Sequence, residues 1–345
     1  MRIGINMAGT QSGSVGAEEV FLRTFISRVP TLRPDLELVV FSDTSNHASF
    51  DGRNAVCLGD PGRAVSSVAS AARKANVDVL ISSAWTAPAK AAMRVVPIVL
   101  SLYGVEKPPE GRLSWFRRDP HAGLRHTLLS APIVIVASEF LRRELLSLFE
   151  VPINRVVVAP PGVSDEFGQS HATIADEPYI LFVGTTTANK NIHRVIDVFS
   201  KVREEFPHSL VVVGKIGEAE PDDWGDRVIR VEHVPVATLA GLYQHCATFL
   251  YPVLYDGSGL TVLEAMRAGA PIVTGRAGAI PEVAGDVPMY SNAESSGALL
   301  GMVRRVLTEP NADLERRIQR GRKLAGEFTW DKCLWKTLAA LKREG

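Results

Sequence analysis

Short runs of apolar residues, many of them β-branched, recur along the chain and alternate with segments of helical periodicity. Continuous runs of this kind are typical of strands buried on both faces. In the first half they are Ile3–Met7, Leu38–Ser42, Ala55–Leu58, Val77–Ile81, Pro97–Leu102, Ile133–Ala137 and Val156–Ala159. In the second half they are Tyr179–Gly184, Leu210–Gly214, Val228–Val231, Thr248–Val253, Ile272–Thr274 and Val287–Tyr290. Because strands and helices alternate, the pattern predicts parallel βαβ units.

Three helices are readable between these runs. Gly16–Val29 carries apolar residues at helical spacing, and Asn191–Phe206 gathers its apolar residues on one face. Thr261–Ala268 is short and apolar, and Gly269 is a good C-cap because glycine readily adopts left-handed backbone. Together with the strands, these helices predict an α/β fold.

The strands form two series with a break between them. Pro160–Gly162 ends the first series, and Ser164–Pro178 is polar and shows no clear period, which is typical of a linker. A new strand begins at Tyr179. We therefore expect two doubly wound domains of similar size with a cleft between them. In such sheets, ligands bind at the carboxyl ends of the strands, near the domain interface.

Composition narrows the class of protein. A chain of 345 residues with 46% hydrophobic residues can build two packed cores, and its zero formal net charge argues against a nucleic acid as the main partner. The cysteines Cys57, Cys246 and Cys333 are far apart and lack metal-ligand spacing, which favours a reducing compartment. The N-terminus lacks the features of a signal peptide, and no run approaches the ~20 apolar residues of a membrane span. We expect a soluble cytoplasmic protein.

Two loops of the second half are candidates for phosphate binding. Gly184–Asn191 has a glycine at the strand end, small hydroxyl residues, and Lys190 just before a helix. Free N–H groups at a helix start and a nearby lysine favour a diphosphate site. A plain capped loop with an exposed lysine explains the same residues. Gly214–Gly217 carries two glycines and Lys215, and it lets backbone approach a ligand closely.

A third loop gives the strongest signal. Tyr255–Leu260 follows a strand and precedes a helix, and Gly257 and Gly259 predict backbone N–H groups that face an anion. Glu264, one turn into the helix, is placed to accept hydrogen bonds from the two hydroxyls of a ribose, and Asp256 to accept them from the transferred sugar. Alternatively, Thr261 to Glu264 is a capping box, in which the glutamate satisfies the helix N-terminus.

The stretch Asp256–Met266 resembles the hallmark Glu-Gly-Phe-Gly-Leu-Pro-Val-Leu-Glu-Ala-Met of the family 4 glycosyltransferases, which are retaining enzymes of the GT-B fold. Spacing and glycines agree, with Asp256 in place of the first glutamate. Other segments resemble family landmarks in the same order; they are Pro161–Val163, Val183–Asn191, Val211–Lys215, Leu239–Ala247, Ala268–Val273, Pro281–Gly285 and Trp330. The resemblance covers the second half closely and the first half mainly by layout.

The resemblance implies a GT-B fold with two Rossmann-like domains. Residues 1–163 would form the acceptor-binding domain, 164–178 the linker, 179–329 the nucleotide-sugar-binding domain, and 330–345 a helix that crosses back to the first domain. Glu264 would bind the ribose, Lys190 the diphosphate, and the backbone of Gly259–Thr261 the phosphates. The implied donor-binding residues are Gly184, Thr185, Asn189, Lys190, Lys215, Asp256, Gly257, Ser258, Gly259, Leu260, Thr261 and Glu264, and the implied catalytic residues are Lys190, Asp256 and Tyr103.

Besides Asp256, the sequence departs from the family pattern at three places. Thr185 and Asn189 are neutral where relatives carry a second basic residue, and losing that charge-assisted hydrogen bond costs about 1.5–3 kcal/mol. Tyr103 stands where many relatives have a histidine near the reacting sugar, so that role is relaxed or falls to His121 or His126. The first loop, which would face the diphosphate or acceptor or else be a flexible connector, has Gly13, Ser14 and Gly16 in place of the usual glycine pair.

The mechanism that the resemblance favours is front-face substitution, in which the leaving diphosphate would help to deprotonate the acceptor and the protein would stabilise the leaving group. We expect a UDP- or GDP-sugar as co-substrate, no further cofactor, no metal, and a glycan, lipid-linked or small-molecule acceptor. The basic, aromatic segment Lys107–Arg125 is either a contact to an anionic lipid at the inner membrane surface or a solvated loop.

Two other readings compete with an active transferase. The changes at Tyr103, Asn189 and Asp256 favour a non-catalytic relative that binds a nucleotide-sugar or a partner transferase. A different GT-B enzyme, such as an epimerase or phosphorylase, is disfavoured by the stretch from Asp256 to Glu264.

Overall fold

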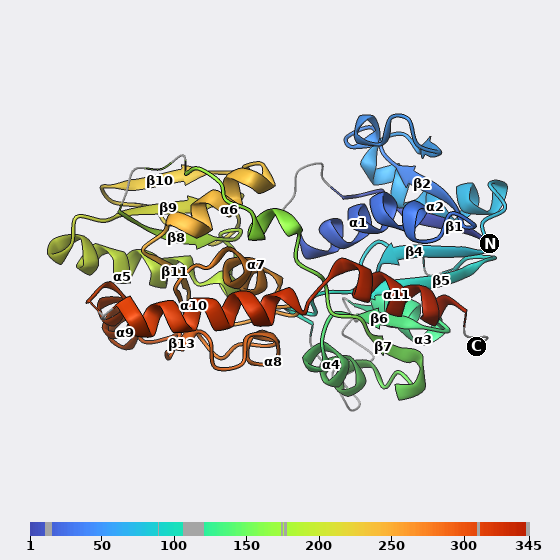
Figure 1. Ribbon diagram of the computed structural model, residues 1–345. Coiled ribbons are helices and arrows are strands. Elements are labelled where there is room, and N and C mark those ends of the chain that lie inside the picture. Colours follow the sequence, from blue (N-terminus) through green and yellow to red (C-terminus); the bar gives the residue numbers. More distant parts are fainter. Residues whose placement is uncertain are drawn as a thin grey trace, which may run out of the picture. The chain divides into compact units, whose positions relative to one another are not determined.

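The computed structural model describes residues 1–10, 16–88, 90–105, 121–173, 175, 178–308 and 311–342. The chain divides into two compact units (Figure 1). The first unit contains Met1–Pro160 together with Asp331–Gly345, and the second unit contains Pro161–Trp330. Each unit is an α/β structure built on one sheet.

The sheet of the first unit has seven parallel strands in the order β3-β2-β1-β4-β5-β6-β7. The strands are β1 (Arg2–Asn6), β2 (Glu37–Ser42), β3 (Ala55–Cys57), β4 (Val79–Ser83), β5 (Arg94–Val99), β6 (Val134–Val136) and β7 (Val156–Val158). The helices are α1 (Ala17–Leu32), α2 (Pro61–Lys74), α3 (Ala122–Ser130), α4 (Glu139–Phe149) and α11 (Trp330–Leu341), with 3₁₀ turns η1 (His47–Phe50) and η3 (Ile153–Arg155). The strand order reverses between β1 and β4.

The sheet of the second unit has six parallel strands in the order β10-β9-β8-β11-β12-β13. The strands are β8 (Tyr179–Val183), β9 (Ser209–Val213), β10 (Val228–Val231), β11 (Thr248–Tyr251), β12 (Ile272–Thr274) and β13 (Met289–Tyr290). The helices are α5 (Ile192–Glu205), α6 (Val236–His245), α7 (Leu260–Ala268), α8 (Ile280–Ala284), α9 (Ser296–Thr308) and α10 (Asn311–Gly326), with 3₁₀ turns η4 (Asp165–Gly168) and η5 (Ala188–Lys190). Here the order reverses between β8 and β11.

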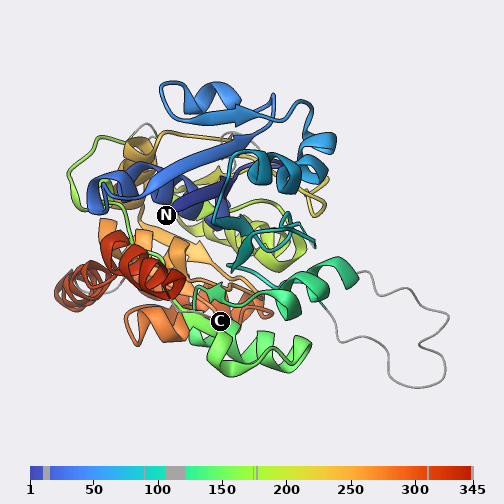
Figure 2. The same cartoon turned by 90° about the vertical axis from the view of Figure 1, so that its right-hand side faces the viewer.

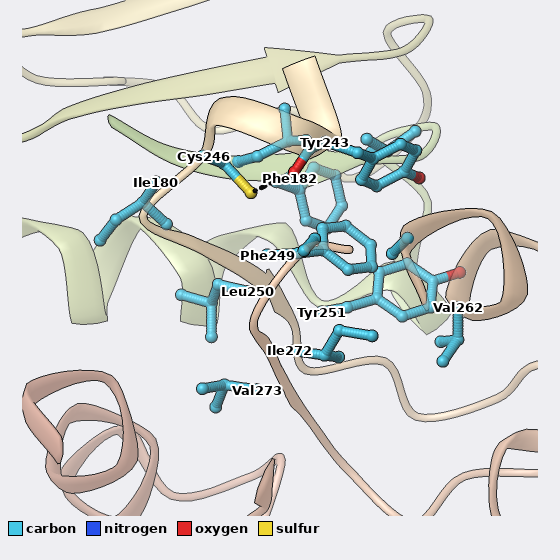
Figure 3. Packing of buried hydrophobic residues seen from close by; sticks show 14 of the residues in the cluster. Ile180, Phe182, Tyr243, Cys246, Phe249, Leu250, Tyr251, Val262, Ile272 and Val273 are labelled. Carbon is cyan, nitrogen blue, oxygen red and sulfur yellow. Dashed lines mark hydrogen bonds between the residues drawn. The ribbon is translucent and has the colours of Figure 1, made fainter. Parts of the chain in front are cut away.

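The central strands are buried along their whole length, as continuous apolar runs predict. Every residue of β4, β8 and β11 is buried. In the second unit, the core contains the stacked rings of Phe249 and Tyr251, with Tyr243 edge-on to Phe249 (Figure 3). This aromatic layer lies directly beneath the carboxyl end of the sheet.

The last helix, α11, belongs to the first unit although the chain has by then passed through the second (Figures 1 and 2). Its Asp331 forms an ion pair with Arg28 of α1 at 3.1 Å, and Arg94 of β5 donates to the Leu341 carbonyl at 3.0 Å. Before this helix, Gly162 lies against Trp330 so closely that a Cβ would be 2.0 Å from the Trp330 nitrogen. No other residue than glycine fits there without displacing backbone.

The segment expected to be a linker, Ser164–Pro178, packs on the second unit where the structure describes it. Phe167 of η4 is buried in the core of that unit, and the His171 amide donates to Gln244 at 2.9 Å. One apolar residue in a polar stretch therefore anchors the segment, and periodicity alone gives no sign of this.

The three cysteines are free. Among the described residues, no helix has both the length and the apolar character that crossing a membrane requires.

Candidate donor site

The reversal of strand order in the second unit places the carboxyl ends of β8 and β11 next to each other. This is the position at which open parallel sheets bind ligands. The two loops that leave these strands, residues 184–191 and 252–259, carry most of the residues predicted for the donor.

Two asparagines join these two loops. The Asn189 side chain donates to the Tyr255 carbonyl at 3.3 Å, and the Asn189 backbone carbonyl accepts from the Leu254 amide at 2.8 Å. Asn191, in the left-handed backbone conformation that asparagine tolerates, donates to the Pro252 carbonyl at 3.0 Å. Asn189 is predicted to contact the donor; in the structure its buried side chain connects the two loops, a role that suits a neutral amide.

Lys190 points inward from the first loop. Its Nζ donates to the Tyr251 hydroxyl at 2.6 Å and lies 3.8 Å from Asp256 Oδ2. It also lies 5.1 Å from the centre of the Tyr251 ring, in cation–π geometry. With 19% of the side chain exposed, the ammonium group is fixed by neighbours yet remains accessible from one side.

Asp256 begins the second loop and holds it in shape. Its Oδ1 accepts from the amides of Ser258 at 3.1 Å and Gly259 at 2.7 Å, and its Oδ2 accepts from the Tyr251 hydroxyl at 2.9 Å. The side chain is only 6% exposed. The carboxylate predicted to contact the transferred sugar therefore makes its hydrogen bonds within the protein.

The glycine-rich loop has the left-handed turn that its sequence suggests. Gly259 has φ of 68°, and a Cβ there would lie 2.4 Å from Val283 Cγ2, so both backbone and packing require glycine. The prediction that Gly257 and Gly259 turn amides toward an anion meets a different arrangement. The Ser258 and Gly259 amides donate to Asp256, and the Leu260 amide donates to Ser258 Oγ at 3.3 Å.

Glu264 does not form a capping box. Helix α7 begins at Leu260 with Gly259 as N-cap and has no side-chain cap, so Thr261 already lies inside the helix. Among the described residues, the Glu264 carboxylate accepts no hydrogen bond. Burial and the nearby Asp256 raise the pKa of Glu264 to about 8. A half-buried carboxylate without a donor is unfavourable, which is typical of a group that a ligand satisfies.

The loop after β9 adjoins the loop after β8. The Thr186 amide donates to the Lys215 carbonyl at 3.1 Å, and the Gly217 amide donates to Thr186 Oγ1 at 2.5 Å. Thr185 and Thr187 share a hydroxyl contact at 3.3 Å. One edge of the sheet thus brings together the predicted residues Gly184, Thr185, Asn189, Lys190, Lys215, Asp256, Gly257, Ser258, Gly259, Leu260, Thr261 and Glu264.

Sequence reasoning missed Tyr251, the last residue of β11. It is fully buried, and its hydroxyl also forms a hydrogen bond with Thr261. The available signal was a hydroxyl-bearing aromatic residue at the carboxyl end of a central strand.

The first unit holds Tyr103, the residue that replaces the family histidine. It follows β5 and is 42% exposed. Trp85, after β4, is 44% exposed, and its indole Nε1 donates to the Ser101 carbonyl at 3.4 Å. His121 lies edge-on to Trp85 at 6.1 Å, whereas His126 is an exposed residue of α3. Two accessible aromatic rings therefore lie at the carboxyl ends of adjacent strands.

Glu18 lies near the same edge, at the start of α1. Ser83 Oγ donates to its Oε2 at 2.5 Å and the Leu100 amide to its Oε1 at 3.5 Å. Burial raises the pKa of Glu18 to about 7. Gly16 is the exposed N-cap of α1, while Gly13 and Ser14 lie outside the described residues, as does most of the basic segment Lys107–Arg125.

No cluster of three or more His, Cys, Asp or Glu side chains suited to a metal ion occurs in the described ranges.

Comparison with known proteins places the chain in a family. The profile "Glycosyl transferases group 1" matches residues 177–309, and "Glycosyltransferase Family 4" matches residues 42–167. The chain belongs to the group 1, or family 4, glycosyltransferases. The predicted family is thus confirmed.

Curated relatives carry the same assignment. O-antigen chain mannosyltransferase B of Escherichia coli is 28% identical over 68% of this chain and 65% of its own length. MMP alpha-(1->4)-mannosyltransferase of Mycolicibacterium hassiacum is 26% identical over 61% of this chain and 54% of its own length. The match therefore spans less than two thirds of either relative.

Solved structures confirm the GT-B fold. Sucrose-phosphate synthase from Thermosynechococcus elongatus superposes with a TM-score of 0.78 at 16% identity, covering 99% of this chain and 98% of that one. HepE of Anabaena, solved in complex with UDP and glucose, gives a TM-score of 0.76 at 13% identity and 99% coverage of both chains.

Proposed function

We propose that this glycosyltransferase is a retaining enzyme that takes its sugar from a nucleoside-diphosphate sugar, bound at the carboxyl edge of the second unit between the loops after β8 and β11. Lys190 binds the diphosphate and Glu264 binds the ribose. The first unit binds the acceptor through the edge that carries Trp85 and Tyr103.

The observation that carries this proposal is Glu264. Its carboxylate lacks a donor among the described residues, its pKa is raised by burial and by Asp256, and it is not a helix cap. Two neighbouring hydroxyls of a ribose supply two hydrogen-bond donors to one carboxylate, which satisfies it without a second charge.

Lys190 provides the electrostatic part of the reaction. An ammonium group has three N–H donors, and within the described residues it makes one hydrogen bond, to Tyr251. The remaining donors stabilise the negative charge that develops on the diphosphate as the glycosidic bond breaks. The leaving diphosphate then accepts the acceptor's proton on the same face, so that the sugar keeps its anomeric configuration.

The relatives guide the choice of substrates. Two of them are mannosyltransferases, one of them for an O-antigen chain, and HepE was solved with UDP and glucose. These names support GDP-mannose and UDP-glucose as the first donors to test, and a growing polysaccharide or lipid-linked glycan as the first acceptor. A cytoplasmic location and a peripheral contact with the membrane stay predictions.

The test is calorimetric titration of UDP, GDP and ADP, and of their sugars, into the wild type and Glu264→Gln. We expect one nucleotide to bind best. Above pH 8, where Glu264 is ionised, the variant should weaken its binding about 10- to 150-fold, because hydrogen bonds to a charged group contribute about 1.5–3 kcal/mol. Exposed Glu204 of α5 offers the matched control Glu204→Gln, which should bind as the wild type does. Equal affinity of Glu264→Gln and wild type refutes the ribose assignment.

A second candidate function is supported by Asp256. Both oxygens of its carboxylate are engaged inside the loop, which suits a protein that binds a nucleotide-sugar without transferring it. Nucleotide-sugar binding without hydrolysis or transfer to any glycan acceptor would favour this candidate.

A further inference from the structure

Four side chains of the second unit form one hydrogen-bonded group around the Tyr251 hydroxyl. It accepts from Lys190 Nζ at 2.6 Å, donates to Asp256 Oδ2 at 2.9 Å, and bonds to Thr261. These three partners come from the loop after β8, the loop after β11 and helix α7. A phenol has one proton and two lone pairs, so three partners use its full capacity.

The Tyr251 hydroxyl lies between Lys190 and Asp256, which are too far apart to form a hydrogen bond with each other. Their closest atoms are 3.8 Å apart, which is too far for a hydrogen bond. Asp256 has no freedom to approach, because two backbone amides hold its other oxygen. Within the part of the chain that the structure describes, the phenolic oxygen is the hydrogen-bonding atom that connects the ammonium group to the carboxylate.

The phenol is protonated at neutral pH. Complete burial and the neighbouring Asp256 carboxylate raise the pKa of Tyr251 well above its usual value. The hydroxyl is therefore a permanent donor to Asp256 and a permanent acceptor for Lys190.

We propose that Tyr251 is a positioning residue, whose hydroxyl bridges Lys190 to a carboxylate too short to reach it and so fixes the ammonium group for the donor diphosphate. This inference rests on the proposed function of Lys190. The bridge orients Lys190 without consuming more than one of its three N–H donors.

The test compares Tyr251→Phe with Tyr243→Phe. Both tyrosines are fully buried and pack on Phe249 in the same aromatic layer (Figure 3). The Tyr243 hydroxyl has no hydrogen-bond partner among the described residues. Its removal therefore converts a buried tyrosine to phenylalanine without the loss of a hydrogen bond. Tyr251→Phe should weaken nucleoside-diphosphate binding about tenfold and leave nucleoside binding unchanged, whereas Tyr243→Phe should change neither.

A second variant supplies rescue. Asp256→Glu lengthens the side chain by one methylene, about 1.5 Å, which spans the gap to Lys190 once the phenolic oxygen is gone. In the wild-type background the longer side chain competes with the hydroxyl and should weaken binding. In the double variant with Tyr251→Phe, diphosphate affinity should recover to above that of Tyr251→Phe alone. Losses that multiply in the double variant overturn the bridge.

The reactivity of Lys190 can also be measured in the absence of a nucleotide-sugar, which tests the bridge independently of the proposed function. Acylation of Lys190, followed by mass spectrometry of the nucleotide-free protein, should be several-fold faster in Tyr251→Phe than in Tyr243→Phe, because the lysine is released. Equal rates overturn the bridge even if nucleotides bind. A wild type that binds no nucleotide, with faster acylation in Tyr251→Phe, refutes the proposed function and leaves the bridge standing.

Discussion

The two sheets reverse their strand order at corresponding places, yet the edges at these points are built differently. In the second unit, side chains bond to one another across loops, as Lys190, Tyr251 and Asp256 do, and little of them is exposed. In the first unit, the edge presents the exposed rings of Trp85 and Tyr103.

The two edges therefore suit different kinds of ligand. A pre-organised polar network suits a charged ligand of fixed chemistry, since its groups need no rearrangement when charge develops. Accessible aromatic rings suit the apolar face of a sugar ring, which varies from one glycan to another.

The largest effect is expected at Lys190. Lys190→Met should lower the rate of sugar transfer about 100- to 1000-fold, the usual cost of removing one donor from a site where charge develops. The matched control is Lys201→Met, an exposed lysine of α5, which should transfer at the wild-type rate. Steady-state kinetics with saturating donor measure both. If Lys190→Met loses less than tenfold, the second unit's network is structural rather than catalytic.

A smaller effect is expected in the stability of Glu264→Gln. Because the pKa of Glu264 is raised from 4.5 to about 8, its contribution to stability is fully present below pH 4.5 and is lost as pH rises through 8. Above pH 8 the variant should therefore be more stable than the wild type, by on the order of 2 kcal/mol after allowance for partial exposure. Urea unfolding between pH 5 and 9 measures this, with Glu204→Gln as control. Parallel stability curves for wild type and Glu264→Gln contradict it.

The smallest effect is expected at the edge of the first unit. Trp85→Ala should raise the KM for a glycan acceptor about tenfold, because an aromatic contact contributes roughly 0.5–1.5 kcal/mol beyond the area it buries. Nucleotide affinity should not change. Trp335→Ala is the control, since Trp335 is 47% exposed on α11 of the same unit. A change in nucleotide affinity in Trp85→Ala would contradict the proposal that the first unit binds only the acceptor and the second unit the donor.

Much of this architecture follows from local sequence. The apolar runs mark the strands, and the central strands β4, β8 and β11 are buried whole, whereas the edge strands β3 and β10 keep exposed residues. Gly259 and Gly269 mark the two ends of α7 because both have left-handed backbone. Lys190 and Glu264 can be assigned to the donor site from the sequence because each lies within a few residues of a strand end or a glycine.

The roles of some residues could not be predicted, because their hydrogen-bond partners are distant in the sequence. Asn189 meets Tyr255 only after the two loops have come together, and no local pattern shows that its amide is used there. Tyr251 is hidden in an apolar run, where its ring explains its presence and its hydroxyl attracts no attention. The capping box failed because the helix begins one residue earlier than the threonine that would cap it.

Because helix α11 belongs to the first unit, that unit cannot finish folding until the end of the chain has been synthesised. Residues 1–160 leave the ribosome well before Asp331, yet the unit that they form includes the helix from that point on. During synthesis the second unit, a contiguous stretch, can therefore complete its core first, which reverses the usual sequence in which N-terminal domains fold ahead of later ones. A premature stop near residue 330 would leave the donor-binding unit intact and the first unit unfinished.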